Sequence, residues 1–549
     1  MRIRIAASGD TLRLIARSDN VDVSALIALN PHISDPDANV GGAQVQLPSS
    51  HQIARSFSTR GHASRSYERN DVPEWIPLTP LERMTENEYD VVIIGSGAGG
   101  AAVTWRLCER WRDKGKRVAV VEKGGLLLPT QVRNLPTMHH SRLMDYFHYV
   151  SEPVSGSATE FSGARQLFAL GGKTLFWDTV SSRLDLPLLP EWPVPRHEMD
   201  TYYEIAERIM KVTKEYTEGA ALSDNLLSRL HHGGFPEATR LPLAIALNPT
   251  RLGAIHSDVC FSSISLLAKA LHTCPFDLTV RTCAMQVLTD SGKVRGVKVM
   301  SSDKRPYLLK AKNVVMSAST FETPRLLLHS GIQNRALGRY LTNQPFMLAT
   351  GRLDRSEFPE RIGTLAVYLR PTKDRPYQVR LTGPGDFWHS GHAEPPLRDE
   401  LDFNLLLFGK TEPCYDNRIV LHPDITDEFG MPELKVHFSY HEADHAVIHQ
   451  MAQGAKQIAA ACGMRLVEQE DGQMVSLMPP GVLHHDSGTC RMGVDPSTSV
   501  TDLYGQVHGI SGLYVADKSV LPYIGAGNPT LTTVALAIRS ADHLIRTSE

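Results

Sequence analysis

Residues 95 to 100 form a glycine pattern that can bind a phosphate group. They read Gly-Ser-Gly-Ala-Gly-Gly, so Gly95, Gly97 and Gly100 satisfy the GxGxxG spacing around Ala98. The first glycine permits a tight turn, the second lets the backbone approach a pyrophosphate, and the third lets a helix pack closely on a strand. The pattern predicts that a dinucleotide pyrophosphate binds at a helix N-terminus.

The segments around this pattern supply the elements that it needs. A near-continuous apolar segment at 89–94 predicts a strand buried in a parallel sheet, a helix is expected at 99–112, and a second apolar strand at 117–122 ends at Glu122. An acid at this strand end accepts hydrogen bonds from the adenosine ribose, and its charge argues against a 2′-phosphate. An adenine dinucleotide other than NADP is therefore predicted.

A second group of residues near the C-terminus favours flavin over nicotinamide. A short apolar strand ends at Asp517, and residues 525–530, Gly-Ala-Gly-Asn-Pro-Thr, lead into a helix at 531–545. Asn528 suits the cap of this helix, Pro529 its first position, and Thr530 its first turn. A strand-end Asp can bind a ribityl hydroxyl, and a helix N-terminus stabilises negative charge on a reduced flavin. FAD is the expected cofactor.

From about residue 87 onward the chain resembles the glucose–methanol–choline (GMC) oxidoreductases. Besides the glycine pattern, segments 317–327, 485–493 and 528–532 are similar to the family's AAGxxxTPxLL, HxxGTxRMG and NPxLT motifs. The resemblance implies an α/β fold in which a Rossmann-like FAD-binding domain is interleaved with an antiparallel-sheet substrate domain. The FAD-binding portions are expected at about 86–180, 255–345 and 496–549, and the substrate-binding portions at about 181–254 and 346–495.

The resemblance also implies a catalytic pair. His485 stands three residues before Gly488, as the family's base does, and a neutral imidazole suits removal of a hydroxyl proton. His484 is one residue out of register and would point the other way in a strand. Asn528 matches the family position that holds His or Asn opposite the base, where its amide can hold the substrate oxygen. Capping of the helix is the other role open to Asn528.

Residues 170–177, Leu-Gly-Gly-Lys-Thr-Leu-Phe-Trp, resemble the loop of pyranose oxidases and of sugar-acid and fructose dehydrogenases. The resemblance implies that Gly171, Gly172 and Thr174 contact the cofactor. In pyranose oxidases a His of this loop carries a covalent flavin bond, and Phe176 stands at that position here, so FAD is expected to bind non-covalently. Ser319 stands where the family usually has Gly.

The N-terminal part has a pattern of its own. Residues 1–49 read as a small βααβ unit that resembles a LysM module, which implies binding of N-acetylglucosamine-containing glycans; an assembly or docking module, through which the protein could form a homo-oligomer, is the alternative. The Ser-, Arg- and Pro-rich residues 50–85 predict an extended linker. The GMC body is then expected at 86–549.

Composition and the remaining motifs narrow the function further. Lys plus Arg is 57 and Asp plus Glu is 60, a net charge of −3 that does not favour nucleic acid. No apolar segment reaches the ~20 residues of a membrane span or forms a signal peptide, so a cytoplasmic protein without a membrane partner is expected. The 7 cysteines are scattered without a CxxC pair. No disulfide framework or Cys-based metal site is therefore expected.

A run of histidines raises the question of a metal. His437, His441, His445 and His449 are spaced by four, so the last three could line one face of a helix. Apart from Glu442 and Asp444, no acid or cysteine is near enough to complete a ligand set. We expect no metal here, and a long helix that backs the substrate sheet.

Together these features predict an FAD-dependent oxidoreductase that acts on CH–OH groups. The expected reaction converts a secondary hydroxyl, at C2 or C3 of a pyranose sugar or glycoside, into a ketone. Electrons would pass to O₂, giving H₂O₂, or to an external acceptor, since the sequence has no haem, iron–sulfur or second dinucleotide motif. The alternatives are oxidation of a non-sugar alcohol and, from another class, an inactive glycan-binding or scaffold protein. Substrate specificity is expected in segments such as 131–165 and 371–398.

Overall fold

The computed structural model describes residues 2–18, 21–47, 75–135, 138, 140–154, 159–247, 259–358, 365–384, 399–469 and 471–548. These residues fall into two compact units, Met1–Glu74 and Trp75–Glu549. The second unit is called the body below.

The N-terminal unit has the predicted βααβ order. It consists of β1 (Arg2–Ile5), α1 (Leu12–Ser18), α2 (Val23–Leu29) and β2 (Gln44–Leu47), and its two strands pair antiparallel. Leu12, Ile15 and Leu26 are fully buried in its core. The side chain of Asn30, which follows α2, donates to the carbonyl oxygens of Leu26 at 2.7 Å and Gln46 at 2.8 Å. The amide thereby ties the helix end to β2.

The Rossmann-like sheet of the body has seven strands. They are β3 (Glu88–Ile94), β4 (Val118–Val121), β10 (Asp277–Thr279), β11 (Thr282–Asp290), β12 (Lys293–Ser301), β13 (Pro306–Met316) and β22 (Leu513–Val515). β13 pairs in parallel with both β3 and β22, while β11 and β12 extend the sheet antiparallel. The carboxyl ends of β3 and β22 therefore lie at one edge, which brings the glycine turn after β3 close to Asp517 after β22.

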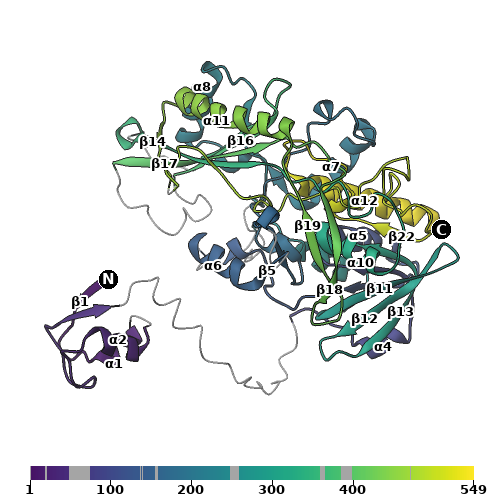
Figure 1. Ribbon diagram of the computed structural model, residues 1–549, viewed down its shortest axis with the longest axis horizontal. Helices are drawn as coiled ribbons and strands as arrows, with labels where there is room; N and C mark the ends of the chain where they lie inside the picture. The colour runs from purple at the N-terminus through teal and green to yellow at the C-terminus, as the bar shows by residue number, and fades with distance from the viewer. Residues whose placement is uncertain are drawn as a thin grey trace. The chain divides into compact units, whose positions relative to one another are not determined.

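Three helices pack together on this sheet. α5 (Ala98–Trp111) follows the glycine turn and packs on α9 (Ile264–Thr273) and α12 (Pro529–Ser548), and α12 also contacts α7 (Arg196–Met210) (Figure 1). Arg106 of α5 pairs with Asp542 of α12 at 2.7 Å. The first and last parts of the body thus form one layer, as the predicted interleaving requires.

The second large sheet is antiparallel throughout. Its strands are β8 (Ala238–Arg240), β14 (Phe346–Asp354), β15 (Leu365–Leu369), β16 (Tyr377–Gly383), β17 (Glu400–Gly409), β20 (Arg465–Val467) and β21 (Ser476–Leu477). The helices α8 (Ala221–His232) and α11 (Glu442–Cys462) cover one of its faces (Figure 1). On β16, Val379 and Leu381 belong to the core under these helices. Because side chains alternate along a strand, Gln378 and Arg380 face the other way.

The remaining elements are smaller. Two-stranded antiparallel sheets are formed by β5 (Ser151–Pro153) with β6 (Arg165–Leu167), β7 (Val212–Thr213) with β9 (Leu243–Ala244), and β18 (Arg418–Thr426) with β19 (Pro432–His437). The other α-helices of the described residues are α4 (Leu81–Thr85), α6 (His140–Val150) and α10 (Ser319–His329).

The predicted linker boundary is wrong at its C-terminal end. Ile76, Leu81 and Met84 are buried in the core of the body, and α4 packs on β13. The backbone N–H of Thr79 donates to the carbonyl of Leu278 in β10 at 2.7 Å. Residues 75–85 therefore belong to the body, because their apolar side chains are buried in its core. Residues 48–74 lie outside the described residues.

The histidine run does not form one helical face. His437 ends β19, and His441 is the N-cap of α11, where the Asp444 carboxylate accepts from its backbone N–H at 2.9 Å. His445 and His449 lie within α11, and His441 immediately precedes it. α11 backs the antiparallel sheet as predicted. Within the described residues, no group of three or more His, Cys, Asp or Glu side chains is placed to hold a metal ion.

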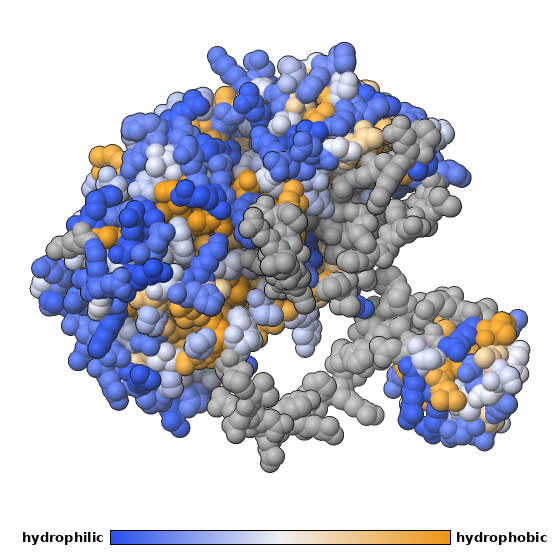
Figure 2. Space-filling model, turned by 180° about the vertical axis from the view of Figure 1, so that it is seen from behind, coloured by the Kyte–Doolittle hydropathy of each residue, from blue (hydrophilic) through white to orange (hydrophobic). Residues whose placement is uncertain are grey.

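The face of the body that is visible in Figure 2 is mainly hydrophilic. Figure 2 shows polar residues over most of one face, with apolar residues gathered in smaller patches between them. None of the described helices combines the length and the apolar character needed to cross a bilayer.

Candidate active site

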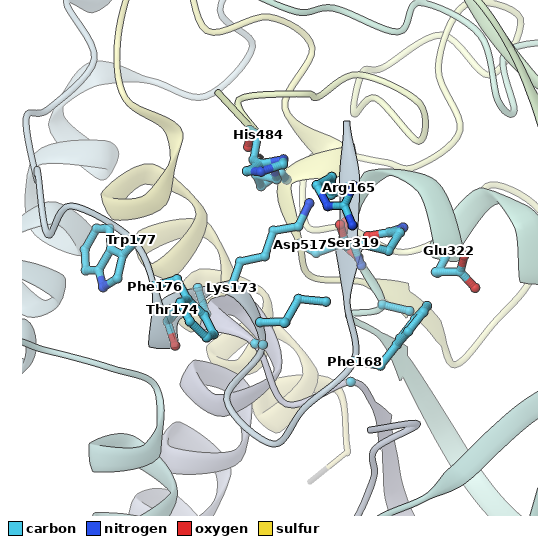
Figure 3. Close-up of a pocket in the computed structure, with 18 of the residues that line it drawn as sticks. Arg165, Phe168, Lys173, Thr174, Phe176, Trp177, Ser319, Glu322, His484 and Asp517 are labelled. Carbon is cyan, nitrogen blue, oxygen red and sulfur yellow. Dashed lines mark hydrogen bonds between the residues drawn. The ribbon is translucent and has the colours of Figure 1, made fainter. Parts of the chain in front are cut away.

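One pocket of the body joins the predicted cofactor residues to the predicted catalytic residues. Gly95, Gly97 and Glu122 line one part of it, and His485 and Asn528 line another. Figure 3 shows His484 on one side of this pocket, with Ser319 and Asp517 grouped near Arg165 and with Thr174, Phe176 and Trp177 on the opposite side.

The glycine turn is built as the spacing predicts. Gly95 has φ +98°, and a Cβ there would lie 2.3 Å from the carbonyl oxygen of Ser317. A Cβ on Gly100 would lie 2.0 Å from the carbonyl oxygen of Gly95, so a side chain would separate α5 from β3. Gly97 is the N-cap of α5, and a Cβ there would meet no atom within 4 Å. The open space beside Gly97 at a helix N-terminus fits a pyrophosphate.

Gly99, which the GxGxxG spacing does not specify, also allows a close approach between two backbone segments. A Cβ on Gly99 would lie 1.7 Å from the carbonyl oxygen of Ala516, at the end of β22. This contact fixes α5 against the strand that carries Asp517. In the sequence, the only indication of this contact is that Gly99 directly precedes Gly100. The role of Gly99 becomes clear only once the structure places β22 beside α5.

Glu122 is buried at the end of β4. Its carboxylate accepts from the backbone N–H of Ser96 at 3.1 Å, the hydroxyl of Ser96 at 2.6 Å and the N–H of Gly124 at 2.8 Å. Burial raises the pKa of Glu122. Glu122 thus holds the glycine turn in place, and its contact with the adenosine ribose stays a prediction.

The Gly171-Gly172 loop is held against the same turn. Gly171 (φ +95°) donates its N–H to the hydroxyl of Ser96 at 3.0 Å, and a Cβ on Gly172 would lie 3.3 Å from the Cα of Gly97. The hydroxyl of Thr174 donates to the carbonyl of Gly171 at 2.6 Å and accepts from the N–H of Ser263 at 2.9 Å. Thr174 therefore shapes the loop, while its predicted contact with the cofactor stays untested.

Asp517 organises the end of β22. Its carboxylate accepts from the N–H and hydroxyl of Ser519, at 2.8 and 2.5 Å, from the N–H of Ser319 at 2.9 Å and from the hydroxyl of Thr323 at 2.6 Å. Four donors from two segments fix the start of α10 beside the pocket. Contact of Asp517 with a ribityl hydroxyl stays a prediction.

Ser319 adopts the backbone conformation of the glycine that it replaces. Its φ is +85°, and its buried hydroxyl has no hydrogen-bond partner in the described part of the chain. A left-handed conformation costs a residue with a Cβ about 1–2 kcal/mol. The sequence has Ser at a position where the family usually has Gly, and the structure shows that this Ser has a strained backbone conformation.

We therefore expect Ser319→Gly to stabilise the protein by about 1 kcal/mol, because glycine adopts this φ without strain. The urea midpoint of unfolding should rise in Ser319→Gly and rise less in Ser319→Ala, which removes the hydroxyl and keeps the Cβ. Equal midpoints for the wild type and Ser319→Gly would show that this backbone is not strained.

His485 is held by a side chain from another segment. Its Nδ1 lies 2.8 Å from Oε1 of Gln344, which is buried just before β14. The amide nitrogen of Gln344 donates to the carbonyl oxygens of Gly525 and Gly527, at 2.9 Å each. Two carbonyl acceptors require the NH₂ end of the amide on that side, so Oε1 must face His485.

This arrangement sets the tautomer of His485. Because Oε1 of Gln344 only accepts, Nδ1 of His485 must carry the proton, which leaves a lone pair on Nε2 in the neutral ring. Nδ2 of Asn528 lies 3.4 Å from Nε2, and Oδ1 of Asn528 accepts from Nε2 of Gln378 at 2.9 Å. The amide of Asn528 is therefore directed at His485 and β16, and Pro529 begins α12 as predicted.

Electrostatics keep this imidazole neutral. Burial, the nearby Arg380 guanidinium and the Lys518 ammonium lower the pKa of His485 to about 3. An unperturbed imidazole would titrate near 6.5. His485 is thus a free base throughout the neutral pH range.

His484 does not point away as a strand would require. Residues 484–486 form no regular element, and His484 has φ +55°. Its ring lines the same pocket, with its centroid 5.4 Å from that of Phe147. It differs from His485 in that its buried Nδ1 has no hydrogen-bond partner among the described residues.

Phe176 packs in an aromatic group beside the pocket. Its ring centroid lies 5.9 Å from that of Tyr146 and 5.4 Å from that of Phe147. A phenyl ring offers no atom for a covalent flavin bond. We therefore expect acid precipitation to release all of the flavin into the supernatant. Flavin fluorescence that remains with the precipitated protein would show a covalent bond to another residue.

Three residues of the site were not predicted from the sequence, namely Gln344, Gln378 and Arg380. Arg380 lines the pocket, and the other two hold His485 and Asn528. They belong to no recognisable motif. The alternation of polar and apolar residues along 377–381 predicts that Gln378 and Arg380 share one face of a strand. It does not predict which residues that face contacts.

A Rossmann-like sheet, a glycine turn open to a pocket and a buried neutral base in that pocket define a dinucleotide-dependent oxidoreductase. Comparison with known families gives GMC oxidoreductase matches to residues 169–346 and 413–537 and a LysM domain match to residues 6–41. The chain belongs to the GMC oxidoreductase family. It is a flavoprotein, an FAD-dependent oxidoreductase that acts on CH–OH donors, and it carries an N-terminal LysM module.

Individual relatives include sugar oxidases. A C-glycoside 3-oxidase of Arthrobacter globiformis is 28% identical over 402 residues, which cover 68% of this chain and 73% of the relative. A pyranose 2-oxidase of Tricholoma matsutake is 29% identical over 271 residues, which cover 43% of this chain and 47% of the relative. The structure of pyridoxine 4-oxidase from Mesorbium loti matches with a TM-score of 0.63 at 17% identity, over 83% of this chain and 99% of that one. This last likeness concerns the fold.

Proposed function

We propose that the protein oxidises a secondary hydroxyl, at C2 or C3 of a pyranose sugar or glycoside, to a ketone. The observation that carries the proposal is the lone pair on Nε2 of His485, in a pocket whose other part is the glycine turn. The names of the relatives, a C-glycoside 3-oxidase and a pyranose 2-oxidase, support a ring hydroxyl as the reacting group.

In the proposed reaction, the residues of the pocket would have the following roles. The turn at Gly95, Gly97 and Gly100 would hold the pyrophosphate of FAD, and non-covalently bound FAD would supply the acceptor for a hydride from the substrate carbon. His485 Nε2 accepts the hydroxyl proton, so two electrons and two hydrogens leave the alcohol. Nδ2 of Asn528 donates to the substrate oxygen as negative charge develops on it. The electrons then pass to O₂ or to an external acceptor.

The roles of the N-terminal unit stay predictions. Residues 1–49 would bind a glycan or mediate self-association, and residues 50–74 would be the linker that tethers them to the body. The division of the body into FAD-binding and substrate-binding portions is likewise proposed.

The test is anaerobic bleaching of the flavin. The purified protein is mixed with pyranoses, O- and C-glycosides, simple primary and secondary alcohols, and buffer alone. We expect bleaching by at least one sugar or glycoside and recovery of the yellow colour with O₂ or a quinone. Bleaching only by non-sugar alcohols would favour the first alternative, and a bound flavin that no member bleaches would favour the inactive scaffold.

A further inference from the structure

A buried cation lies beside the base without an anion at hydrogen-bond distance. Arg380 of β16 is 5% exposed and lines the pocket, and its guanidinium carbon lies 4.1 Å from the ring centroid of Phe408. Its Nη1 lies 3.8 Å from Oδ2 of Asp178, which is longer than a hydrogen bond. Its Nε has no hydrogen-bond partner in the described part of the chain.

Asp178 does not neutralise Arg380 on its own. Oδ1 of Asp178 accepts from Nη2 of Arg133 at 2.7 Å, and the Asp178 side chain is 50% exposed. Two guanidinium groups therefore share one carboxylate. A buried charge is expensive to keep unless a partner reaches it. Burial accordingly lowers the pKa of Arg380 to about 10, even with Asp178 nearby.

The position of Arg380 ties it to the substrate. Gln378, two residues earlier on the same strand face, donates to Asn528. The ring of His485 is stacked on Phe408 with centroids 5.9 Å apart, so the base and the guanidinium lie on the same aromatic side chain. The pyrophosphate of FAD is expected at Gly97, in the other part of the pocket, so Asp178 stays the anion nearest to this cation.

We propose that Arg380 binds a carboxylate of the substrate, and that the substrate is a pyranose or glycoside bearing one carboxylate. The planar guanidinium offers two parallel N–H groups that match a carboxylate. The guanidinium charge, which Asp178 neutralises only in part, favours a negative group on the substrate. This inference rests on the proposed sugar oxidation and narrows its substrate class.

The test compares substrates that differ only in this charge. Anaerobic flavin reduction is measured with methyl β-D-glucuronide, its methyl ester and methyl β-D-glucoside, in the wild type and in Arg380→Gln and Arg380→Lys. We expect the wild type to prefer the glucuronide to its ester by roughly 10- to 100-fold in reduction rate over Kd, the usual effect of a charged hydrogen bond. The preference should fall toward one in Arg380→Gln and persist in part in Arg380→Lys. FAD content of each variant checks folding.

Each outcome decides between the two claims. Equal reduction by the glucuronide and its ester in the wild type would overturn the role of Arg380 and leave sugar oxidation standing. An acid preference that survives in Arg380→Gln would assign the carboxylate to another cation and also overturn it. Failure of every sugar and glycoside to reduce the flavin would overturn the proposed function itself. The wild-type comparison decides even if Arg380→Gln does not fold.

Discussion

His485→Asn is expected to slow anaerobic flavin reduction by substrate ~10²–10⁴-fold, the usual contribution of a general base. The variant removes Nε2, whose lone pair accepts the hydroxyl proton in the proposed reaction. FAD should stay bound, because the glycine turn, the Gly171-Gly172 loop and the end of β22 lie on other segments. The measurement is stopped-flow absorbance of the flavin, with FAD content determined for each sample.

His484→Asn is the matched control. Asparagine tolerates a positive φ, so the change should preserve the backbone at His484, where φ is +55°. Loss of this ring from the pocket wall should slow flavin reduction by less than about 10-fold, because Gln344 and Asn528 form their hydrogen bonds with His485 and not with His484. A larger loss in His484→Asn than in His485→Asn would transfer the role of base to His484.

Gln344→Leu is expected to slow flavin reduction by ~10- to 100-fold, since the buried Nδ1–H of His485 would lose its acceptor and Nε2 would no longer be kept free of the proton. Gln344→Glu tests the hydrogen bond between residue 344 and Nδ1 of His485 through the pH dependence of flavin reduction. The pKa of His485 is lowered to about 3, so the wild-type rate should be constant from pH 5 to 7. A carboxylate beside Nδ1 favours the protonated ring and should raise that pKa by ~1–3 units.

The sign of this effect is specific. A protonated imidazole does not accept the hydroxyl proton, so the rate in Gln344→Glu should fall as the pH is lowered from about 6.5 to 4.5, while the wild type stays nearly constant. A purely structural loss would lower the rate by the same factor at every pH. Identical pH profiles in the wild type and Gln344→Glu would show that Gln344 does not act on His485.

The sequence predicts the local structure of the site correctly where the residues involved lie close together in the chain. The roles of Gly95 and Gly100 follow from local backbone geometry, and the position of Pro529 follows from its fixed φ, so spacing alone is informative. The interleaved fold followed from the family resemblance, since the sequence of strands and helices does not by itself say that β22 pairs with β13.

The parts that were missed depend on the register of distant strands. Gln344 reaches His485 across 141 residues of sequence, and Gln378 reaches Asn528 across 150. The strong shift in the pKa of His485 depends on burial and on Arg380, which no local motif contains. The start of the body was placed too late because the prolines near 75–85 suggested a tether, although Ile76, Leu81 and Met84 are buried.

The most direct test of the central claim is a deuterium isotope effect on flavin reduction. The best substrate of the panel is prepared with deuterium at C2 alone, at C3 alone and at C1 alone, and each is mixed anaerobically with the wild type. Oxidation of a secondary ring hydroxyl predicts slower reduction with the C2 or the C3 label and an unchanged rate with the C1 label. Slower reduction only with the C1 label, or with a label outside the ring, would contradict the account.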